Sequence, residues 1–380
     1  MNTVEIEATN ECNTRCLHCP HETITRPKGK MTWETFQIVA DKVLAYGKTQ
    51  AIDFAGMGEP TLNPDLPRFI AYFKGKIPTY ITTNASALTA KNIEKLIEAG
   101  LGTIILSFNG ADAATYELMM GGLSFERADK YITNLVNQAK GHINIVANVS
   151  VTKQTRDKLK EIKTYLNNKG IDKIFFSLCH NRGGHLKGNS VCDTPIPPAF
   201  IKQCDIFDHT LFVAWTGEVL ACCHDLDGVG KIGDLLTDPL EQIVQFKESL
   251  RGRGAVFPMC ASCNDLYRFS GQASINGKPV REWIYALHTH QSELAGMYID
   301  ALRQRDALVE TYEARANQAQ AEAEHYKHQL LEAQHRLQVL EGQVRRLESL
   351  LRAYEQGRFM RFMRLLKQTI RKLTAHATGQ

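Results

Sequence analysis

The sequence lacks any segment that would direct the chain out of the cell or into a membrane. No basic start followed by an apolar stretch opens it, and no apolar run approaches the length of a membrane span. Its 10 cysteines are therefore interpreted as metal ligands in a reducing compartment rather than as disulfides. A net charge of +4 over 380 residues indicates no general affinity for nucleic acid. We expect a cytoplasmic, oxygen-sensitive protein of two or more domains.

Three cysteines stand close together near the start of the chain. Cys12, Cys16 and Cys19 have the spacing C-x3-C-x2-C. Three thiolates can hold three corners of a [4Fe–4S] cluster and leave the fourth iron open to a small molecule. The alternative is a zinc site that uses His18 or His21. Zinc sites usually combine two cysteine pairs, and no second pair lies within about the next hundred residues.

A glycine-containing loop follows the second predicted strand. Residues 51–55 read as a short strand that runs into Gly56-Met-Gly-Glu-Pro60. Glycines at the carboxyl end of a strand let backbone approach a ligand, and Glu59 offers a carboxylate to an ammonium group. Taken alone, this pattern is more typical of an ordinary turn.

Strands and helices alternate over the first half of the chain. Strands are predicted at residues 4–6, 51–55, 79–83, 103–108, 143–151 and 173–178, and helices at 31–46, 66–74, 89–99, 125–140 and 156–168. Nearly continuous apolar strands separated by helices predict an α/β fold with a parallel sheet covered by helices. Six such units fit a partial (β/α)6 barrel, in which the functional residues lie at the carboxyl ends of the strands.

A second set of cysteines lies in a segment of different character. Residues 210–222 read as a β-hairpin with a Thr-Gly turn. Five cysteines stand around it, namely Cys204, Cys222, Cys223, Cys260 and Cys263. One ligand from the hairpin, the preceding cysteine and the following C-x2-C pair make four thiolates, which can fully ligate an iron–sulfur cluster. A structural zinc site and unrelated reduced thiols are the alternatives.

With both cysteine sets and the glycine loop, residues 1–270 resemble the radical S-adenosylmethionine (SAM) superfamily with its SPASM/twitch extension. The resemblance implies that the first triplet holds the cluster that cleaves SAM to a 5′-deoxyadenosyl radical. It also implies SAM contacts from Gly56, Gly58, Glu59, Pro60, Thr83, Asn84, Ser107 and Asn148. Met57 departs from the usual second glycine of the family motif. For the last four residues, capping of the turn that follows each strand is an equal alternative.

The resemblance further implies that Cys204, Cys222, Cys260 and Cys263 bind one auxiliary [4Fe–4S] cluster, with Cys223 as a neighbour. Full SPASM domains carry further cysteines for a second auxiliary cluster, and none follows Cys263 here. This arrangement looks like that of the aminocyclitol dehydrogenase of aminoglycoside biosynthesis. A radical SAM oxidoreductase that abstracts hydrogen from a substrate C–H is therefore expected. The general base is not identified; the candidates are His180, His185 and Asp225.

The substrate class stays open between two possibilities. A sugar, glycan precursor or other small molecule is favoured over a peptide, because Val4 already belongs to the first predicted strand and leaves no room for a peptide-recognition domain. A peptide maturase of the SPASM group is the alternative, and a non-catalytic iron–sulfur or zinc scaffold is the rival from another class. An electron donor such as flavodoxin or ferredoxin is expected, whereas a nucleic-acid substrate is not, because residues 1–290 hold no basic cluster.

The end of the chain has a heptad pattern. From Ser292 glycine and proline almost vanish, and apolar residues from Tyr326 to Tyr354 recur in steps of four and three. This period predicts a coiled coil that forms a homo-oligomer or binds a partner. Residues 357–380 then form a basic amphipathic tail without acidic residues, typical of membrane-surface or acidic-partner binding. A solvated tail is the alternative. The predicted division is 1–190, 191–275, 285–356 and 357–380.

Overall fold

The computed structural model describes residues 3–186, 204–251, 253, 256–265, 274–275, 278–279 and 292–377. Two compact units are distinguished, Met1–Arg303 and Gln304–Gln380. The first contains a nine-stranded sheet in the order β11-β10-β9-β1-β3-β4-β5-β7-β8. Its six barrel strands are parallel and follow chain order, namely β1 (Thr3–Ile6), β3 (Ala51–Phe54), β4 (Thr79–Thr83), β5 (Thr103–Ser107), β7 (Asn144–Val151) and β8 (Ile174–Leu178). This confirms the prediction of a partial (β/α)6 barrel.

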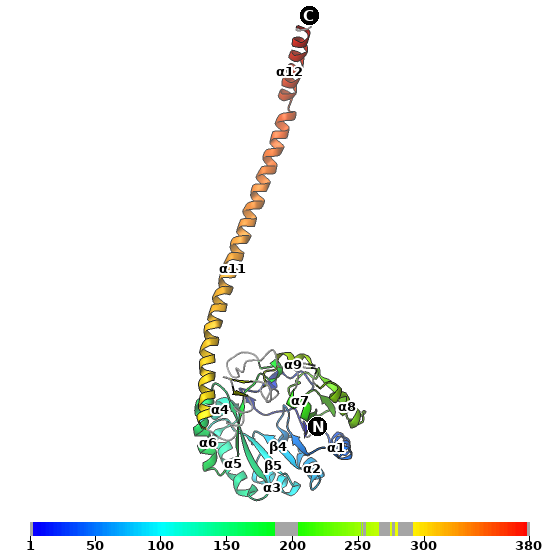
Figure 1. The fold of residues 1–380 in the computed structure, drawn as a ribbon, viewed down its shortest axis with the longest axis vertical. Coiled ribbons are helices and arrows are strands. Elements are labelled where there is room, and N and C mark those ends of the chain that lie inside the picture. Colours follow the sequence, from blue (N-terminus) through cyan, green and yellow to red (C-terminus); the bar gives the residue numbers. More distant parts are fainter. Residues whose placement is uncertain are drawn as a thin grey trace. The chain divides into compact units, whose positions relative to one another are not determined.

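Helices between these strands cover one face of the sheet (Figure 1). They are α1 (Trp33–Tyr46), α2 (Leu66–Phe73), α3 (Ala90–Ala99), α5 (Phe125–Ala139) and α6 (Leu159–Asn168). The side chains of Thr32 and Thr89 cap the first turns of α1 and α3, and Gly47 and Gly100 end these helices in the left-handed conformation. The sequence did not anticipate α4 (Ala113–Met119), which leads into the short strand β6 (Met120–Gly121).

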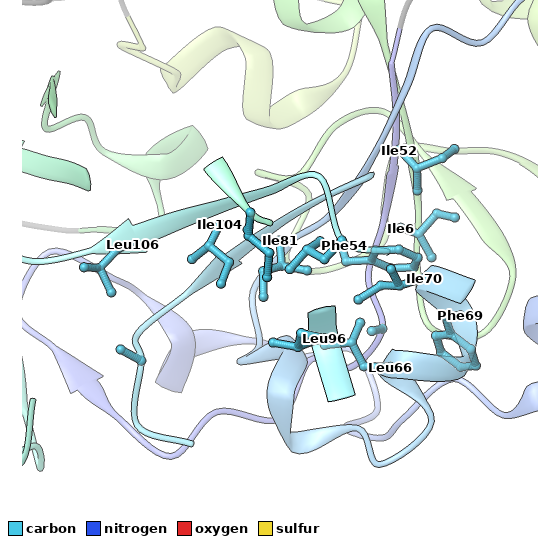
Figure 2. Close-up of a cluster of buried hydrophobic side chains, with 14 of the residues drawn as sticks. Ile6, Ile52, Phe54, Leu66, Phe69, Ile70, Ile81, Leu96, Ile104 and Leu106 are labelled. Carbon is cyan, nitrogen blue, oxygen red and sulfur yellow. The ribbon is translucent and has the colours of Figure 1, made fainter. Parts of the chain in front are cut away.

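Alternation along the strands separates two faces of the sheet. Ile6, Ile52 and Ile81 are fully buried on the face that packs against α2 and α3, where they lie near Phe69 and Ile70 (Figure 2). Burial of this apolar cluster drives the docking of the helices. The intervening residues of β1, β3 and β4 point to the opposite, inner face, because successive side chains of a strand alternate in direction.

The second cysteine segment extends the same sheet. β9 (Thr210–Val213) and β10 (Glu218–Leu220) form the predicted hairpin, and β11 (Lys231–Asp234) follows as its third strand. β9 pairs in parallel with β1 along four residues. Helices α7 (Asp205–His209), α8 (Leu240–Ser249) and α9 (Pro258–Ser262) complete this segment. The sequence did not predict the pairing of β9 with β1. The domain boundary predicted at residues 190–191 lies outside the described residues.

The second unit is helical. α11 (Ser292–Gln356) begins at the end of the first unit, and α12 (Arg358–Ala377) follows Gly357. Residues 285–291 of the predicted helix lie outside the described residues. On α11 the apolar heptad positions are exposed, with 53–66% of their surface accessible at Tyr326, Leu330, Leu337, Leu340, Val344 and Leu347. Among the described residues, no helix combines the length and the apolarity needed to cross a membrane.

A buried ion pair ties the start of the barrel to its surroundings. Glu7, directly after β1, receives two hydrogen bonds from the Arg26 guanidinium at 2.9 and 3.0 Å. The two side chains are 0% and 7% exposed. Glu7 also accepts the backbone N–H of Met57 at 3.3 Å and that of Trp215 at 3.5 Å. One carboxylate therefore joins four segments of the chain.

We predict that Arg26→Met destabilises the protein by about 3–5 kcal/mol, because it leaves the Glu7 carboxylate buried without its charged partner. The free energy of unfolding is measured by urea denaturation followed by tryptophan fluorescence. The matched control is Lys30→Met, which breaks the half-exposed Lys30–Glu11 pair and should cost about 1 kcal/mol or less. Equal losses in the two variants would contradict the role assigned to the buried pair.

Candidate functional site

The first cysteine triplet lies on a loop that is held from both sides. β2 (Arg15–Cys16) pairs with β6, and the Leu17 N–H donates to the carbonyl of Met119 at 3.0 Å. The Cys19 N–H donates to the carbonyl of Cys16 at 3.0 Å, which closes the turn between these two cysteines. The loop therefore has a defined path before any metal is bound.

Thr14 brings two sulfurs of the triplet to one place. Its hydroxyl oxygen lies 3.1 Å from the Cys12 Sγ and 3.4 Å from the Cys16 Sγ. Burial, together with the neighbouring Cys19 and Cys12, raises the pKa of Cys16 to about 12. Burial likewise raises the pKa of Cys19. Clustered thiols of this kind fit a site for a soft, positively charged cluster, because metal binding replaces the thiol protons.

The glycine loop packs directly on the chain that leads into Cys12. The Glu59 N–H donates to the carbonyl of Glu11 at 2.9 Å. A Cβ atom at Gly58 would lie 2.1 Å from the carbonyl oxygen of Thr9, so only glycine fits there. Gly56 has φ +128°, which also favours glycine. The two motifs that are distant in sequence are thus brought into contact.

Glu59 is buried at this contact, and its carboxylate accepts four hydrogen bonds. Its Oε1 accepts hydrogen bonds from the Thr61 N–H at 3.2 Å, from the Thr61 hydroxyl at 2.5 Å and from the Thr83 hydroxyl at 2.7 Å. Its Oε2 accepts the Asn84 N–H at 2.7 Å. Burial raises the pKa of Glu59, and these donors oppose the rise. The carboxylate therefore fixes the end of β4, and Oε2, with a single donor, is the oxygen with acceptor capacity left.

The other residues expected to contact SAM fall into two groups. Asn84 lies beside the cysteine loop, because its Nδ2 donates to Asn13 Oδ1 at 3.0 Å. Pro60 begins the 3₁₀ turn Pro60–Leu62 after Glu59. Ser107 and Asn148 are register partners on β5 and β7, farther along the sheet, where Asn148 accepts a hydrogen bond from Ser177. The structure thus gathers Gly58, Glu59, Thr83 and Asn84 around the triplet, and no described contact joins Ser107 or Asn148 to them.

The second cysteine set also converges. Burial raises the pKa of Cys222 well above its usual range, and the nearby thiols of Cys204, Cys263 and Cys260 raise it further. Cys204 is the N-cap of α7, Cys260 lies on α9, and Cys263 follows α9 directly. Four neighbouring thiols from a hairpin and two short helices fit the ligand set of one cluster. Their assignment as ligands stays a prediction.

Cys179 departs from the expectation that the cysteines are reduced. It directly follows β8 and is disulfide-bonded, so it is not available as a metal ligand. No member of either cysteine set forms a disulfide, as ligation requires. No sequence pattern indicates this difference, because a disulfide depends on the distance between two sulfurs in space.

Cys223 faces a different part of the molecule. Its thiol lies near Glu5 on β1, and burial together with this carboxylate holds its pKa well above the usual range. Glu5 is the register partner of Asp53 on β3. Sequence reasoning passed over Glu5 and Asp53, although each stands alone as an acidic residue between apolar ones in a predicted strand. That pattern was the available signal.

The three candidate bases lie in different surroundings. His180 Nε2 lies 3.5 Å from Asp265 Oδ2, and His185 Nε2 lies 3.9 Å from Asp227 Oδ2. The carboxylate of Asp225 instead accepts the backbone N–H groups of residues 229 and 230 at 3.1 and 2.8 Å and so holds a turn. A cavity of about 570 Å³ lies between the cysteine loop and residues 184–186, with Asp227 in its wall.

Comparison with known proteins agrees with this geometry. Residues 6–166 match the model of the Radical SAM superfamily, and residues 204–264 match the iron–sulfur cluster-binding SPASM domain. The chain belongs to the radical SAM superfamily. Its cofactors are [4Fe–4S] clusters and SAM.

Curated relatives cover only part of the chain. The tungsten-containing aldehyde ferredoxin oxidoreductase cofactor-modifying protein of Pyrococcus furiosus is 26% identical over 182 residues, which are 47% of this chain and 51% of that protein. The mycofactocin maturase MftC of Mycobacterium tuberculosis is 25% identical over 159 residues, 42% of this chain and 40% of that protein. The chain thus spans about half or less of the length of these two relatives.

Solved structures share the fold at low identity. BtrN, in complex with AdoMet and 2-DOIA, is 19% identical, with a TM-score of 0.51 over 72% of this chain and 95% of BtrN. Streptococcus suis SuiB, bound to the precursor peptide SuiA, is 16% identical, with a TM-score of 0.54 over 70% of each chain. At these identities the likeness supports the fold alone.

Proposed function

We propose that this radical SAM enzyme oxidises a small molecule, such as a sugar or glycan precursor, at an unactivated C–H bond. The observation that carries the proposal is the joining of the two cysteine sets through one sheet. β9 precedes Cys222 and pairs with β1, which leads into Cys12. A rigid sheet holds both expected clusters at fixed positions relative to the inner face, as an electron-accepting second cluster requires.

The expected cofactors supply the reactive chemistry. When bound, the first cluster and SAM supply a 5′-deoxyadenosyl radical under reduction by a flavodoxin or ferredoxin, and the second cluster supplies an electron acceptor. Oxidation of a substrate alcohol then removes one hydrogen atom to 5′-deoxyadenosine, one electron to the acceptor and one proton to a base. In this proposal Cys12, Cys16 and Cys19 would hold the first cluster, and Glu59 Oε2 would receive the SAM ammonium group. His180 is the preferred base, because its Nε2 lies 3.5 Å from Asp265 Oδ2.

The choice of a small molecule over a peptide rests on two points. The last cysteine of the chain is Cys263, so the chain offers ligands for one auxiliary cluster. BtrN, which shares this fold, is in complex with AdoMet and 2-DOIA rather than with a peptide. The alternative is peptide maturation, and it is kept because SuiB is bound to a precursor peptide and MftC is named a maturase.

Iron, sulfide and SAM cleavage test the proposal directly. The protein is reconstituted anaerobically, iron and labile sulfide are counted per chain, and 5′-deoxyadenosine is measured under dithionite. We expect about eight irons for two [4Fe–4S] clusters. In the Cys12/Cys16/Cys19→Ala variant, iron should fall by about half and SAM cleavage should be lost, because only the auxiliary cluster remains.

The control is Cys223→Ala, which removes a free thiol that neighbours the second set without belonging to it and should keep the iron content. Zinc in place of iron at the second site would remove the proposed electron acceptor. Full iron loading without SAM cleavage would contradict the enzyme and favour the scaffold.

We further propose that α11 forms a homodimeric coiled coil. Its apolar heptad positions are exposed in the single chain, and their period of 3.5 residues matches a left-handed supercoil. Pairing with a second copy would remove this row of side chains from water.

We predict that Leu340→Lys converts a dimer to a monomer, because it places a charge in the apolar seam. The matched control is Val339→Lys, the neighbouring exposed position outside the seam. Mass is measured by analytical ultracentrifugation against the chain mass of 42.7 kDa. A monomeric parent chain, or equal effects of the two variants, would contradict the dimer.

We also propose that α12 holds the enzyme at the cytoplasmic face of an anionic membrane. Phe362, Met363 and Ile370 are exposed, and so are the cations Arg361, Arg364, Lys367, Arg371 and Lys372 in the part of the helix whose burial is described. No acidic residue lies in residues 357–380. Such a helix binds by its apolar side and by attraction to anionic headgroups.

Vesicle co-sedimentation tests this proposal. The full chain should sediment with phosphatidylserine-containing vesicles and weakly with phosphatidylcholine alone, because each basic residue near an anionic surface contributes about 1 kcal/mol. A chain ending at residue 356 should lose the binding. A matched full-length variant, Arg361/Arg364/Arg371→Gln, keeps the apolar face and should lose the preference for anionic lipid. Equal partitioning of all three proteins would exclude a membrane role for α12.

A further inference from the structure

A lysine is buried in the segment that carries the second cysteine set. Lys247 lies on α8 and is 5% exposed, on the same helix face as the buried Leu240, Ile243 and Val244. This face calls for an apolar residue, because an ammonium group loses its hydration when it is buried. Lysine is almost never buried to this extent unless a partner compensates its charge. The position of Lys247 therefore requires a reason other than packing.

The ammonium group lies against the short helix that follows Cys204. Lys247 Nζ donates a hydrogen bond to the backbone carbonyl of Thr210, the residue that ends α7. The same Nζ lies 4.8 Å from the centroid of the Phe207 ring. The Phe207 N–H in turn donates to the Cys204 Sγ at 3.5 Å. Two neutral groups thus hold the ammonium group beside one of the four thiols.

A second thiol reaches the same place from the hairpin. Leu220 at the end of β10 is in register with Phe212 on β9, and the strands are antiparallel. Two residues farther along the hairpin, the one chain leads to Cys222 and the other back to Thr210, which accepts the lysine hydrogen bond. The ammonium group is therefore placed near the thiols of both Cys204 and Cys222.

The charges around Lys247 agree with this placement. Burial lowers the pKa of Lys247 to about 8, whereas Cys222, Asp208 and Cys204 oppose this fall. Arg251 adds to the fall, but its own charge is compensated, because its Nε lies 3.4 Å from the Asp208 carboxylate. Among the residues that the structure describes, no ion pair joins Lys247 to an acid. The thiols of the second cysteine set are thus the anionic partners that this buried cation can have once they are ionised.

An iron–sulfur cluster would meet this need and would be changed by it. Four thiolates outweigh the positive charge of the cluster core, and reduction adds one more negative charge. A cation in a medium of low polarity stabilises the reduced form more than the oxidised form, so the reduction potential rises. A raised potential is what an electron acceptor needs.

We propose that Lys247 is the counter-cation of the second cluster and raises its reduction potential, so that the cluster can take the electron of the substrate radical. In this step the radical loses one electron and one proton, the cluster is reduced by one electron, and the base takes the proton. The inference rests on the proposed function and names the residue that sets the potential of the same site. Lys247 touches neither the substrate nor SAM in this role and acts through Cys204 and Cys222.

The reduction potential of the second cluster tests the proposal. It is measured by anaerobic redox titration followed by electron paramagnetic resonance in the full-length Cys12/Cys16/Cys19→Ala background, where only this cluster is expected. Lys247→Gln can still donate to the Thr210 carbonyl but has no charge. At the midpoint potential of the background protein, its ratio of oxidised to reduced cluster should be about tenfold higher, which is a fall of about 59 mV for a one-electron couple.

Two further variants separate the charge from the structure. Lys247→Arg keeps the positive charge, and its ratio should stay within about threefold of the background protein. The matched control is Lys42→Gln on α1. Lys42 donates to the carbonyls of Leu235 and Asp238 at 2.6 and 2.8 Å, in the same segment, and no described contact joins it to a cysteine. This variant should leave the ratio unchanged.

An unchanged potential in Lys247→Gln would overturn the proposal, as would an equal fall in Lys247→Arg or in Lys42→Gln. Iron is counted in each variant. Loss of iron from Lys247→Gln alone would support the proposal, because the arginine variant retains the cation. Loss from both Lys247 variants would overturn it by giving the residue a structural role only.

Failure of this inference and failure of the proposed function are separable. Iron at the second site with a potential that does not depend on Lys247 refutes the inference alone. A potential that depends on Lys247, in a protein that fails to cleave SAM when Cys12, Cys16 and Cys19 are intact, refutes the proposed function alone. Zinc at the second site refutes both.

Discussion

The Glu7–Arg26 ion pair is the interaction on which the arrangement of the site depends. Arg26 belongs to the segment after the cysteine triplet, and Glu7 joins it to the backbone of Met57 and Trp215 as well. The cysteine loop, the glycine loop and the turn between β9 and β10 are therefore held by one buried carboxylate. A buried charge tolerates little movement of its partners, because any loosening leaves it unpaired in a medium of low polarity. The three loops are consequently fixed before any cofactor binds.

The pairing of β9 with β1 makes the two cysteine sets parts of one structure. Each set lies on loops and short helices beside the sheet, and the sheet hydrogen bonds run without interruption from β11 to β8. The segment from Asn181 to Gly184 adds a second connection, since Asn181 donates to Asn264 Oδ1 at 2.6 Å and to the Ser262 carbonyl at 2.6 Å. Two clusters held in this way would keep a constant separation, which an electron transfer between substrate and cluster requires.

The two faces of the barrel strands differ in the side chains that they carry. The outer face is apolar and packs on helices, so its residues serve the fold (Figure 2). The inner face carries Glu5 and Asp53, two partly buried acids in register with each other.

Much of the fold followed from the sequence, because local rules decide it. Apolar alternation and caps such as Thr32 and Gly47 predicted the strands and helices to within a few residues, and the cysteine spacings, with the family resemblance, indicated the cofactors. What lay beyond the sequence were contacts between distant segments, such as Glu7 with Arg26 and β9 with β1. Glu59 shows the difference. The motif indicated that Glu59 matters for function. Only the tertiary structure showed that its carboxylate accepts hydrogen bonds from Thr61, Thr83 and Asn84. Hydrogen-bond partners are set by positions in space rather than by spacing along the chain.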